Sequence, residues 1–380
     1  MSENNLNIQM VDLKGQYEKI KTQVDQAIDD VLSSTQFING EHVKSFQNEL
    51  AAYLGVKHVI TCANGTDALQ ICLMSLDLKP GYEVITTDFT FASTVEVIML
   101  LGLTPVLVDV DPVNFNIDMQ KIRKSITKKT KVIIPVHLFG QSVDMDELLS
   151  ISQEFDLKII EDNAQAMGAS YIFKNGEQKK TGTIGDISAT SFFPSKNLGG
   201  YGDGGAIFTN DDELATKISG ISNHGMYKRY HHDIVGVNSR LDSIQAAILD
   251  VKLKLLDDYN NSRKKFAKMY TDLLSNNSKI IVPKFPENHL SHVFHQYTLK
   301  ITNKKRDPLV NYLSENGIPC GIYYPIPLHS QKAYSSTRNN DKNFKVTNDL
   351  CKEVISLPMH TELDENQIKY ISNKVLEFIN

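Results

Sequence analysis

The amino-acid sequence predicts an α/β protein, in which a large domain with a mainly parallel sheet is followed by a smaller α+β C-terminal domain. Between residues 56 and 219, short apolar runs alternate with segments of helical periodicity, which is the pattern of βαβ units. Beyond a long helix expected over 241–275, the pattern changes to isolated strand and helix segments. The chain has 380 residues, 41 % of them hydrophobic, which suffices for two cores. We therefore expect domains at 1–250 and 251–380.

Each apolar run of the first domain is predicted to be a buried strand, and each periodic segment to be the helix that leads to the next strand. The strands expected in this series cover residues 58–62, 83–87, 105–109, 131–136 and 158–161. The helices expected between them cover residues 67–76, 93–101, 118–126 and 144–155. Strands that alternate with helices of this length indicate a parallel sheet.

Two further strand-like runs, 187–193 and 206–209, follow each other without a helix between them. They are predicted to be neighbouring strands joined by a glycine-dense loop. The segments expected in the C-terminal domain are a strand at 295–301 and helices at 306–316 and 365–378. Together they predict a compact α+β unit.

Composition excludes several classes of function. The formal net charge is −5 and the isoelectric point is near 6.1, so there is no electrostatic reason to expect binding to nucleic acid or to an anionic membrane. No apolar stretch is long enough to span a membrane, and the first residues do not resemble a signal peptide, so we expect a cytoplasmic protein. The irregular positions of His224, His231 and His232 do not form a metal-binding set, and no metal is expected.

A single lysine, Lys196, stands between an apolar run and the glycine-dense loop within residues 191–206. Side chains are sparse in such a loop, so the backbone can approach a ligand closely. Lys196 is therefore predicted to be a reactive amine held in a pocket. Upstream, Asp162 and Gln165 stand at the end of a short buried strand, where a parallel sheet presents its catalytic groups.

A strand-end acid and a pocket lysine together point to pyridoxal 5′-phosphate (PLP). In PLP chemistry a lysine amine forms a Schiff base with the cofactor, and a carboxylate keeps the pyridine nitrogen protonated so that the ring accepts electrons. Taken alone, Asp162 could equally be the N-cap of a helix, but its pairing with Lys196 favours the catalytic interpretation. Gly200, Gly202 and Gly205 formally match a dinucleotide fingerprint. A strand follows them instead of a helix, so nicotinamide binding is not expected.

The segment Asn64-Gly65-Thr66 lies between a predicted strand and a predicted helix. Its backbone N–H groups and the Thr66 hydroxyl would face an anion at the helix N-terminus. A helix cap without a ligand is the equally frequent alternative for this motif alone. Ser191, at the end of the strand before Lys196, could supply a second hydroxyl to the same phosphate. Phe91 follows a strand and could stack on a planar ring at the strand ends, with ordinary core packing as its alternative.

These segments resemble the DegT/DnrJ/EryC1/StrS sugar aminotransferases, which have the aspartate-aminotransferase fold (PLP fold type I). The resemblance covers nearly the whole chain. It rests on Val11-Asp-Leu-Lys-Gly-Gln-Tyr, Asn64-Gly-Thr-Asp-Ala-Leu-Gln, Glu161-Asp-Asn-Ala-Gln, residues 191–206, Gly236-Val-Asn-Ser-Arg-Leu-Asp and Tyr324-Pro-Ile-Pro-Leu.

The resemblance implies a role for each matching residue. Lys196 is expected to be the Schiff-base lysine and proton shuttle, and Asp162 to pair with the pyridinium nitrogen. The other cofactor contacts that it implies are Gln165 at the phenolic oxygen, Phe91 on the ring, and Gly65, Thr66 and Ser191 at the phosphate. It further implies a homodimer, in which Asn238 of one subunit reaches the phosphate in the other.

Within this family the sequence looks closest to enzymes that aminate C3 of UDP-2-acetamido-2-deoxy-3-oxo-D-glucuronate. In those enzymes an arginine matching Arg240, and a histidine at the position of Tyr323, are candidate contacts for the sugar carboxylate. Tyrosine at position 323 removes a potential cation and leaves open a neutral 3-oxo or 4-oxo sugar on UDP or dTDP. The function expected is PLP-dependent transfer of an amino group, with L-glutamate as donor, to a nucleotide-linked keto-sugar in the biosynthesis of surface polysaccharides or glycans.

Two alternatives to this function stay open from sequence. Some relatives are PLP-dependent sugar dehydratases, which carry histidine at the lysine position, so Lys196 favours transamination. The other alternative is a non-catalytic regulator that binds PLP as a sensor. The presence of Lys196, Asp162 and Gln165 argues against it.

Overall fold

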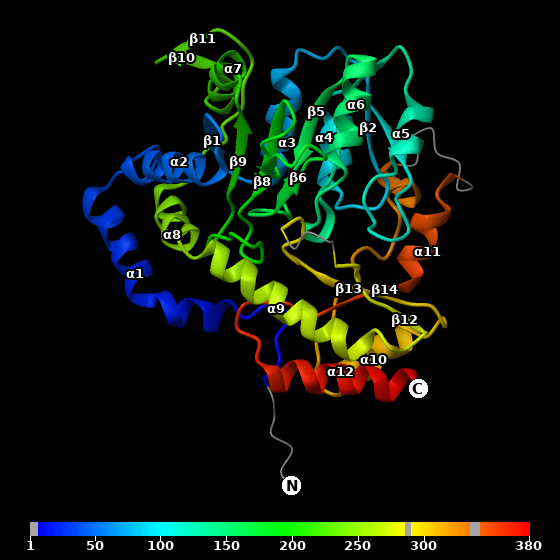
Figure 1. Ribbon diagram of the computed structural model, residues 1–380. Coiled ribbons are helices and arrows are strands. Elements are labelled where there is room, and N and C mark those ends of the chain that lie inside the picture. The colour runs from blue at the N-terminus through cyan, green and yellow to red at the C-terminus, as the bar shows by residue number, and fades with distance from the viewer. Residues whose placement is uncertain (1–6, 286–289, 335–342) are drawn as a thin grey trace.

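The computed structural model describes residues 7–285, 290–334 and 343–380. Its central feature is a seven-stranded sheet in the order β1-β9-β8-β5-β4-β2-β3 (Figure 1). The strands of this sheet are β1 (His58–Cys62), β2 (Glu83–Thr87), β3 (Thr104–Val108), β4 (Thr130–Ile134), β5 (Lys158–Asp162), β8 (Ile187–Ser191) and β9 (Gly205–Thr209). All pairs from β8 to β3 are parallel, whereas β9 is antiparallel to both β8 and β1. The prediction of a mainly parallel sheet is confirmed.

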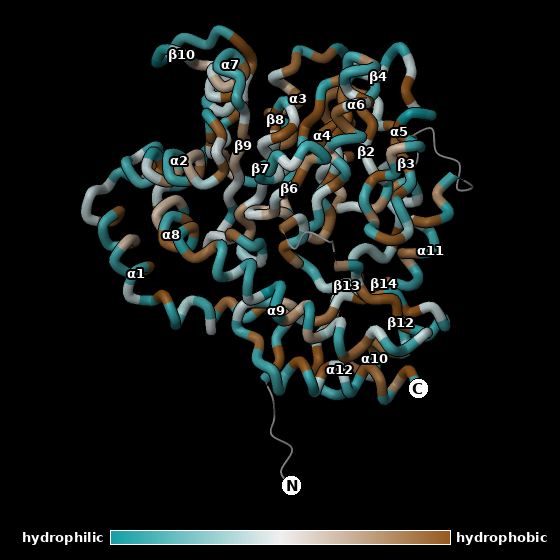
Figure 2. The backbone as a smooth tube through the Cα atoms, viewed as in Figure 1, coloured by the Kyte–Doolittle hydropathy of each residue, from teal (hydrophilic) through white to brown (hydrophobic). Residues whose placement is uncertain are grey.

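Helices cover both faces of this sheet. The helices involved are α3 (Gly65–Ser75), α4 (Ser93–Leu100), α5 (Met119–Ser125), α6 (Met145–Phe155) and α7 (Asp212–Ser222). On β4, Val132 and Ile134 pack with residues of α3, α4 and α7, whereas the intervening Ile133 packs with residues of α5 and α6. Because successive side chains of a strand point to opposite faces, a continuous apolar run is needed to serve both layers. Figure 2 shows hydrophobic residues concentrated along these central strands.

Two N-terminal helices, α1 (Leu13–Ser34) and α2 (Glu41–Leu54), were not among the expected elements. Apolar residues of α1 pack with residues of α8 (Ser243–Leu253), and those of α2 pack with residues of β1, β9 and α8. Just before α1, Ile8 inserts into the core of the C-terminal part. The N-terminal segment therefore packs both against α8 and against the core of the C-terminal part. The domain boundary at residue 250 stays a prediction.

The long helix expected over 241–275 is wrong as a single element, because the chain forms α8 and then α9 (Leu256–Leu274). Leu255, between them, has φ −108° and ψ 0°, outside the helical region. Leu253 and Leu256 are both buried, so the apolar periodicity continues across the break and gives no sign of it. In Figure 1, α9 runs diagonally from α8 towards the C-terminal part of the chain.

The C-terminal part is an α+β unit, as predicted. Its antiparallel sheet has the order β12-β13-β14 and packs with residues of α9, α10 and α12 around one apolar core. The elements here are α10 (Arg306–Glu315), α11 (Lys345–Glu353), α12 (Glu365–Ile379), β12 (Ile280–Ile281), β13 (Tyr297–Ile301) and β14 (Val354–Leu357). The remaining short strands are β6 (Ser170–Ile172), β7 (Gln178–Lys180), β10 (Met226–Lys228) and β11 (His231–His232). None of the helices in the described residues is long and apolar enough to cross a membrane.

Candidate active site

A cavity of about 470 Å³ lies at the carboxyl ends of the parallel strands, against the glycine-dense loop. It collects most of the residues that the sequence singled out. The predicted site residues that line it are Gly65, Thr66, Phe91, Asp162, Gln165, Ser191, Lys196 and Tyr323. This position agrees with the general rule that open α/β sheets bind ligands beyond the carboxyl ends of their strands.

One end of the cavity is formed by the N-terminus of α3. Asn64 is its N-cap, and the Asn64 side chain accepts a hydrogen bond of 2.8 Å from the Asp67 N–H. A Cβ atom at Gly65 would lie only 2.7 Å from Cβ of Ser191, so glycine is required for the start of α3 to meet the end of β8. Asn64 therefore caps the helix, while Gly65, Thr66 and Ser191 form a small cradle beside it. Free N–H groups and hydroxyls at a helix N-terminus suit a phosphate.

The acid of the predicted pair, Asp162, is the last residue of β5 and is 5 % exposed. Its carboxylate accepts hydrogen bonds from the Thr94 hydroxyl (2.9 Å) and from the Ala164 N–H (3.2 Å). A turn follows it rather than a helix, so the N-cap alternative is wrong. Burial raises the pKa of Asp162, and the hydrogen bond from Thr94 opposes that rise. A cationic group in the cavity would favour the ionised carboxylate.

The lysine of the pair, Lys196, is held by the turn that follows β8. Its N–H donates to the Phe193 carbonyl (2.8 Å), and the Gly200 N–H donates to the Phe192 carbonyl (2.8 Å). A Cβ atom at Gly199 would lie 2.4 Å from the Pro194 carbonyl oxygen, so this tight loop needs glycine there. Burial lowers the pKa of the Lys196 amine to about 8, although the nearby Asp162 carboxylate raises it. A lysine with a lowered pKa is a better nucleophile near neutral pH.

The Gln165 amide is oriented by two partners. Its Oε1 accepts a hydrogen bond from the Phe139 N–H (2.7 Å), and its Nε2 donates to the Tyr324 hydroxyl (3.2 Å). Burial raises the pKa of Tyr324, so this hydroxyl stays protonated and keeps a hydrogen to donate into the cavity. Phe139 has a φ of 55° and Gly140 a φ of 96°. This left-handed turn aims the Phe139 N–H at Gln165.

Phe91 is 58 % exposed, so core packing, the alternative weighed for it, is wrong. The core residue of its loop is Phe89, which is 1 % exposed. Phe91 lines the cavity, where an aromatic face can cover a planar ring.

Two predicted residues, Asn238 and Arg240, are not among those that line the cavity. Asn238 is exposed and pairs through its backbone with Asn223. The hydroxyl of Ser239, which lies between Asn238 and Arg240, donates to the Asp67 carboxylate (2.6 Å) and accepts from the Ala63 N–H (3.0 Å). The segment is thus fixed beside α3 while Asn238 stays exposed.

Sequence reasoning missed several groups of the site. Those that were given no role in the site are Thr94, Tyr324, Asp203, His295 and Gln296. His295 lies within the strand predicted at 295–301, but β13 begins only at Tyr297 and His295 lines the cavity. Burial lowers the pKa of His295, and its Nδ1 has no hydrogen-bond partner among the described residues. Tyr324 and Asp203 stand within segments that carry the family resemblance, but no pattern in the sequence places any of these five residues in the site, because they come together only through the fold.

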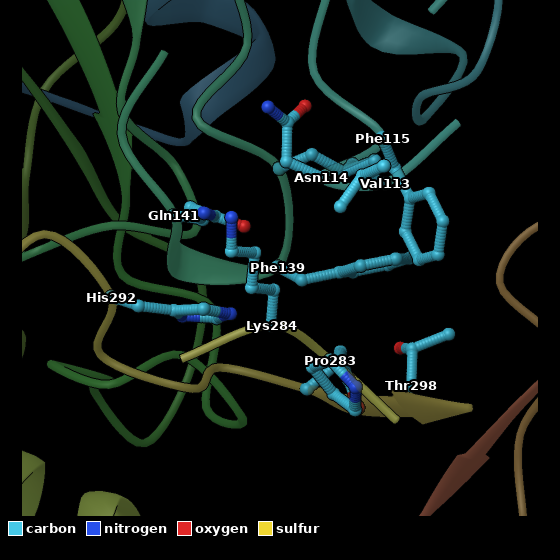
Figure 3. A pocket seen from close by; sticks show the side chains of 11 residues that line it. Val113, Asn114, Phe115, Phe139, Gln141, Pro283, Lys284, His292 and Thr298 are labelled. Atoms are coloured by element: carbon cyan, nitrogen blue, oxygen red, sulfur yellow. The ribbon is translucent and has the colours of Figure 1, made fainter. Parts of the chain in front are cut away.

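A second, much smaller cavity of about 10 Å³ lies behind Phe139 (Figure 3). Phe139 and Gln296 line both cavities. Figure 3 shows the Phe139 ring beside Phe115, with Pro283 and Thr298 contributed from the C-terminal part. The Phe115 and Phe139 rings meet edge to face at 6.2 Å, so they form a packed wall. The space behind that wall is large enough only for about one water molecule.

Comparison with known proteins decides the family. The model of the DegT/DnrJ/EryC1/StrS aminotransferase family matches residues 18–376. The chain belongs to this family.

Three of the relatives that match nearly the full length represent the range of their names. A "pleiotropic regulatory protein" of Geobacillus stearothermophilus is 46 % identical over 98 % of this chain and 99 % of its own. The UDP-2-acetamido-2-deoxy-3-oxo-D-glucuronate aminotransferase of Pseudomonas aeruginosa is 45 % identical over 96 % of this chain and 98 % of its own. The UDP-N-acetyl-3-dehydro-alpha-D-glucosamine 3-aminotransferase of Acidithiobacillus ferrooxidans is 41 % identical over 98 % of both chains.

Solved structures agree with this assignment. A family aminotransferase from Brucella abortus has a TM-score of 0.93 at 38 % identity, covering 98 % of this chain and 100 % of its own. NtdA from Bacillus subtilis, solved with bound cofactor PMP, has a TM-score of 0.89 at 29 % identity, covering 100 % of this chain and 87 % of its own. The fold is that of the PLP aminotransferases, and this aminotransferase is PLP-dependent.

The residues of the cavity fit PLP. The cradle formed by Gly65, Thr66 and Ser191 suits the phosphate, and a side chain at position 65 would fill it. Asp162 offers a buried carboxylate for the ring nitrogen, and Lys196 offers an amine of lowered pKa for the aldehyde. The cavity therefore carries groups suited to each reactive part of the cofactor.

The lowered pKa of Lys196 predicts a pH dependence for cofactor attachment. Only the neutral amine attacks an aldehyde, so the neutral fraction and the attachment rate of cofactor-free enzyme should rise with pH, with a midpoint at about 8. Borohydride trapping followed by peptide mass spectrometry at Lys196 measures that rate at each pH. A midpoint near the ordinary lysine pKa of 10.5 would contradict this expectation.

Proposed function

We propose that this aminotransferase moves the amino group of L-glutamate to a UDP-linked 2-acetamido-3-oxo sugar, with the sites of a homodimer shared between subunits. Glutamate leaves as 2-oxoglutarate, and the amino group replaces the keto oxygen of the sugar. The relatives named for UDP-linked 3-oxo sugars, at 45 % and 41 % identity over nearly the full chain, support this substrate class. The observation that carries the chemistry is the enclosure of Lys196, Asp162 and the α3 cradle in one cavity.

The chain's own residues divide the work as follows. When bound, PLP supplies a ring that accepts electrons from the substrate carbon. Gly65, Thr66 and Ser191 hold the phosphate, and Phe91 covers the ring. The Asp162 carboxylate holds the proton of the ring nitrogen. Lys196 Nζ takes the proton from the amino-bearing carbon and returns it at C4′ of the cofactor. Such acid–base catalysis is typically worth about 10²- to 10⁴-fold in rate.

The two relatives named for UDP-linked 3-oxo sugars differ in the oxidation state of the sugar at C6, because one is named for a glucuronate and the other for a glucosamine. Tyr323 lines the cavity, and burial raises its pKa, so its hydroxyl is a neutral hydrogen-bonding group. Asp203 lines the same cavity with a carboxylate. Among the described residues of one chain, Lys196 is the only lysine or arginine that lines the cavity. These groups favour a sugar with a neutral C6 over a uronate, because an added carboxylate would face Asp203 without a free cation.

The regulator alternative is supported by the names of relatives, such as the "pleiotropic regulatory protein" and a "sensory transduction protein" of Saccharopolyspora erythraea. The lowered pKa of Lys196 and its proximity to Asp162 are features that catalysis needs and that cofactor sensing does not. The dehydratase alternative is disfavoured because lysine occupies position 196.

The proposal is tested by following the visible spectrum of the cofactor. Addition of L-glutamate should convert the lysine-linked form to the pyridoxamine form, with release of 2-oxoglutarate. The amine-loaded enzyme is then offered UDP- and dTDP-linked sugars with a keto group at C3 or C4 and with a neutral or carboxylate C6. Recovery of the lysine-linked form with the neutral UDP 3-oxo sugar is the expected result. A cofactor spectrum that no amino donor alters would favour the regulator instead.

The shared site predicts complementation between two defective variants. Asn238 is exposed in the single chain, and in a homodimer it would reach the partner's phosphate cradle. Mixing Lys196→Ala with an impaired Asn238→Asp variant should produce heterodimers with one site intact in both respects. Activity should approach half of the wild-type value per heterodimer.

Native mass spectrometry provides the control for that mixture, by confirming that heterodimers form. If heterodimers form without any recovery of activity, Asn238 acts in the site of its own chain or outside the site.

A further inference from the structure

The segment 320–329 carries two tyrosines of the cavity wall and is anchored beyond them. Tyr323 and Tyr324 line the cavity, and Tyr324 contacts Gln165 through its hydroxyl. After the exposed Ile326 the chain turns into the structure again at Leu328 and His329, which are both buried. The position of the tyrosines therefore depends on what holds the far end of the segment.

That end is held by Asp88, the residue that directly follows β2. The Asp88 carboxylate accepts a hydrogen bond from the His329 N–H (2.8 Å) and another from His329 Nδ1 (2.6 Å). The Asp88 carbonyl accepts from the Leu328 N–H (3.3 Å). The His329 ring also stacks on Phe344, with 4.4 Å between ring centroids. Asp88 is 0 % exposed, so water cannot replace these bonds without opening the segment.

Asp88 also connects this segment to the opposite wall of the site. The loop that it begins continues through Phe89 to Thr90 and Phe91, and the last two line the cavity. Phe89 packs edge to face against Tyr324, with 5.9 Å between ring centroids. One carboxylate thus fixes the tyrosine segment to the same strand end that presents Phe91. The hydrogen bonds between Asp88 and His329 therefore set the distance between the two walls.

We propose that Asp88 is a positioning residue, which through His329 holds Tyr323 and Tyr324 at the cavity for binding of the sugar. It touches neither cofactor nor substrate. The kinetic part of this inference rests on the proposed sugar substrate, whereas the structural part does not. Loss of the Asp88 contact should therefore weaken sugar binding more than it slows the reaction of the cofactor with glutamate, in which Lys196 and Asp162 carry the chemistry.

The structure supplies a matched control. Asp109 follows β3, is 1 % exposed, and also clamps a C-terminal element, because its carboxylate accepts from the N–H groups of Val346 (2.9 Å) and Thr347 (2.8 Å). Its carboxylate also pairs with Lys121 of α5 (3.0 Å), and none of these partners lies on the tyrosine segment. Asp88→Asn and Asp109→Asn therefore each remove a buried carboxylate that clamps the chain. Only the first removes a direct contact of the tyrosine segment.

The first measurement needs no substrate. The chain contains no tryptophan, so Ile326→Trp, at a side chain that is 47 % exposed, places a single fluorescent reporter on the segment. In that background Asp88→Asn should lower the fluorescence anisotropy of the reporter and raise its quenching by acrylamide, while Asp109→Asn should change neither. Equal anisotropy in all three proteins would overturn the proposal, whatever the sugar substrate proves to be.

The second measurement is kinetic and uses the chain without the reporter. For Asp88→Asn the KM of the keto-sugar should rise about tenfold, as expected for one lost hydrogen bond to a charged group. The kcat and the rate of the glutamate half-reaction should change less than this KM. For Asp109→Asn the KM should not rise. An unchanged KM in a folded Asp88→Asn protein would contradict the positioning role.

A second pair of variants keeps the test decisive if Asp88→Asn does not fold. His329→Asn retains an N–H donor near the position of Nδ1, whereas His329→Leu fills the space without a donor. The asparagine variant should keep most of the sugar affinity, and the leucine variant should lose it. Equal KM values for these two variants would show that the contact with Asp88 is not what positions the tyrosines.

Discussion

Lys196→Ala is expected to abolish turnover while leaving the fold intact. The change removes the amine of lowered pKa that would attach the cofactor and move the proton, and no other lysine among the described residues lines the cavity. The Lys196 side chain points into a cavity and is not part of a packed cluster, so its loss leaves the backbone hydrogen bonds of the turn in place. Loss of general acid–base catalysis alone costs about 10²- to 10⁴-fold, and loss of covalent attachment adds to this.

Three measurements check that expectation. Turnover is followed as 2-oxoglutarate release, folding by circular dichroism and thermal unfolding, and attachment by borohydride reduction and mass spectrometry. Lys196→Arg is the matched control, because it keeps a cation but provides no amine that attacks the aldehyde. Normal turnover in the alanine variant, or a reducible adduct on another lysine, would exclude Lys196 as the catalytic amine.

Asp162→Asn is expected to retain cofactor but lose most of the rate. The asparagine amide is nearly isosteric with the carboxylate. Its oxygen can still accept the hydrogen bond that the Thr94 hydroxyl donates to Asp162 (2.9 Å) in the unaltered protein. It lacks the charge that keeps a ring nitrogen protonated. Removing one preorganised electrostatic partner typically costs about 10²- to 10³-fold in kcat. Single-turnover kinetics with glutamate measures this loss directly.

Thr94→Val distinguishes the effect of the charge of the Asp162 carboxylate from the effect of its orientation. It removes the hydroxyl that holds the carboxylate but leaves the carboxylate itself, so its effect on the rate should be clearly smaller. If Asp162→Asn reacted as fast as the parent, the electron-sink role of Asp162 would be wrong, and the buried acid would have to be explained by structure alone.

The fold could be predicted where the sequence repeats a pattern. The strand starts at His58, Glu83, Lys158 and Ile187 agree with the prediction to the residue, because a strand buried on both faces is a continuous apolar run. The helix expected at 241–275 failed for the same reason, since Leu253 and Leu256 extend the apolar pattern through the break. Periodicity reports which residues are buried, not whether the chain changes direction between them.

The site could be predicted only in part. Lys196, Asp162 and Thr66 stand next to glycines or at strand ends, which are local signals, and the structure brings them into one cavity. Tyr324 and His295 are distant in sequence from all three. Tyr324 begins a segment that carries the family resemblance, but neither residue has a local signal for its contacts in the site. Thr94 lies inside an expected helix, where a threonine normally needs no explanation. Its contact with Asp162 depends on the order of the strands, which the sequence pattern leaves open.

The insertion of Ile8 among the side chains of the C-terminal core affects the stability expected for fragments of this chain. Ile8 is 7 % exposed there, and the Met359 N–H donates to the Met10 carbonyl nearby (3.4 Å). A fragment that begins at residue 251 would have a hole where Ile8 sits, and filling it would require the peptide from the other end. Supplying residues 7–34 as a separate peptide should therefore raise the melting temperature of such a fragment. In the intact chain the N-terminal segment acts as a tethered ligand of the C-terminal core.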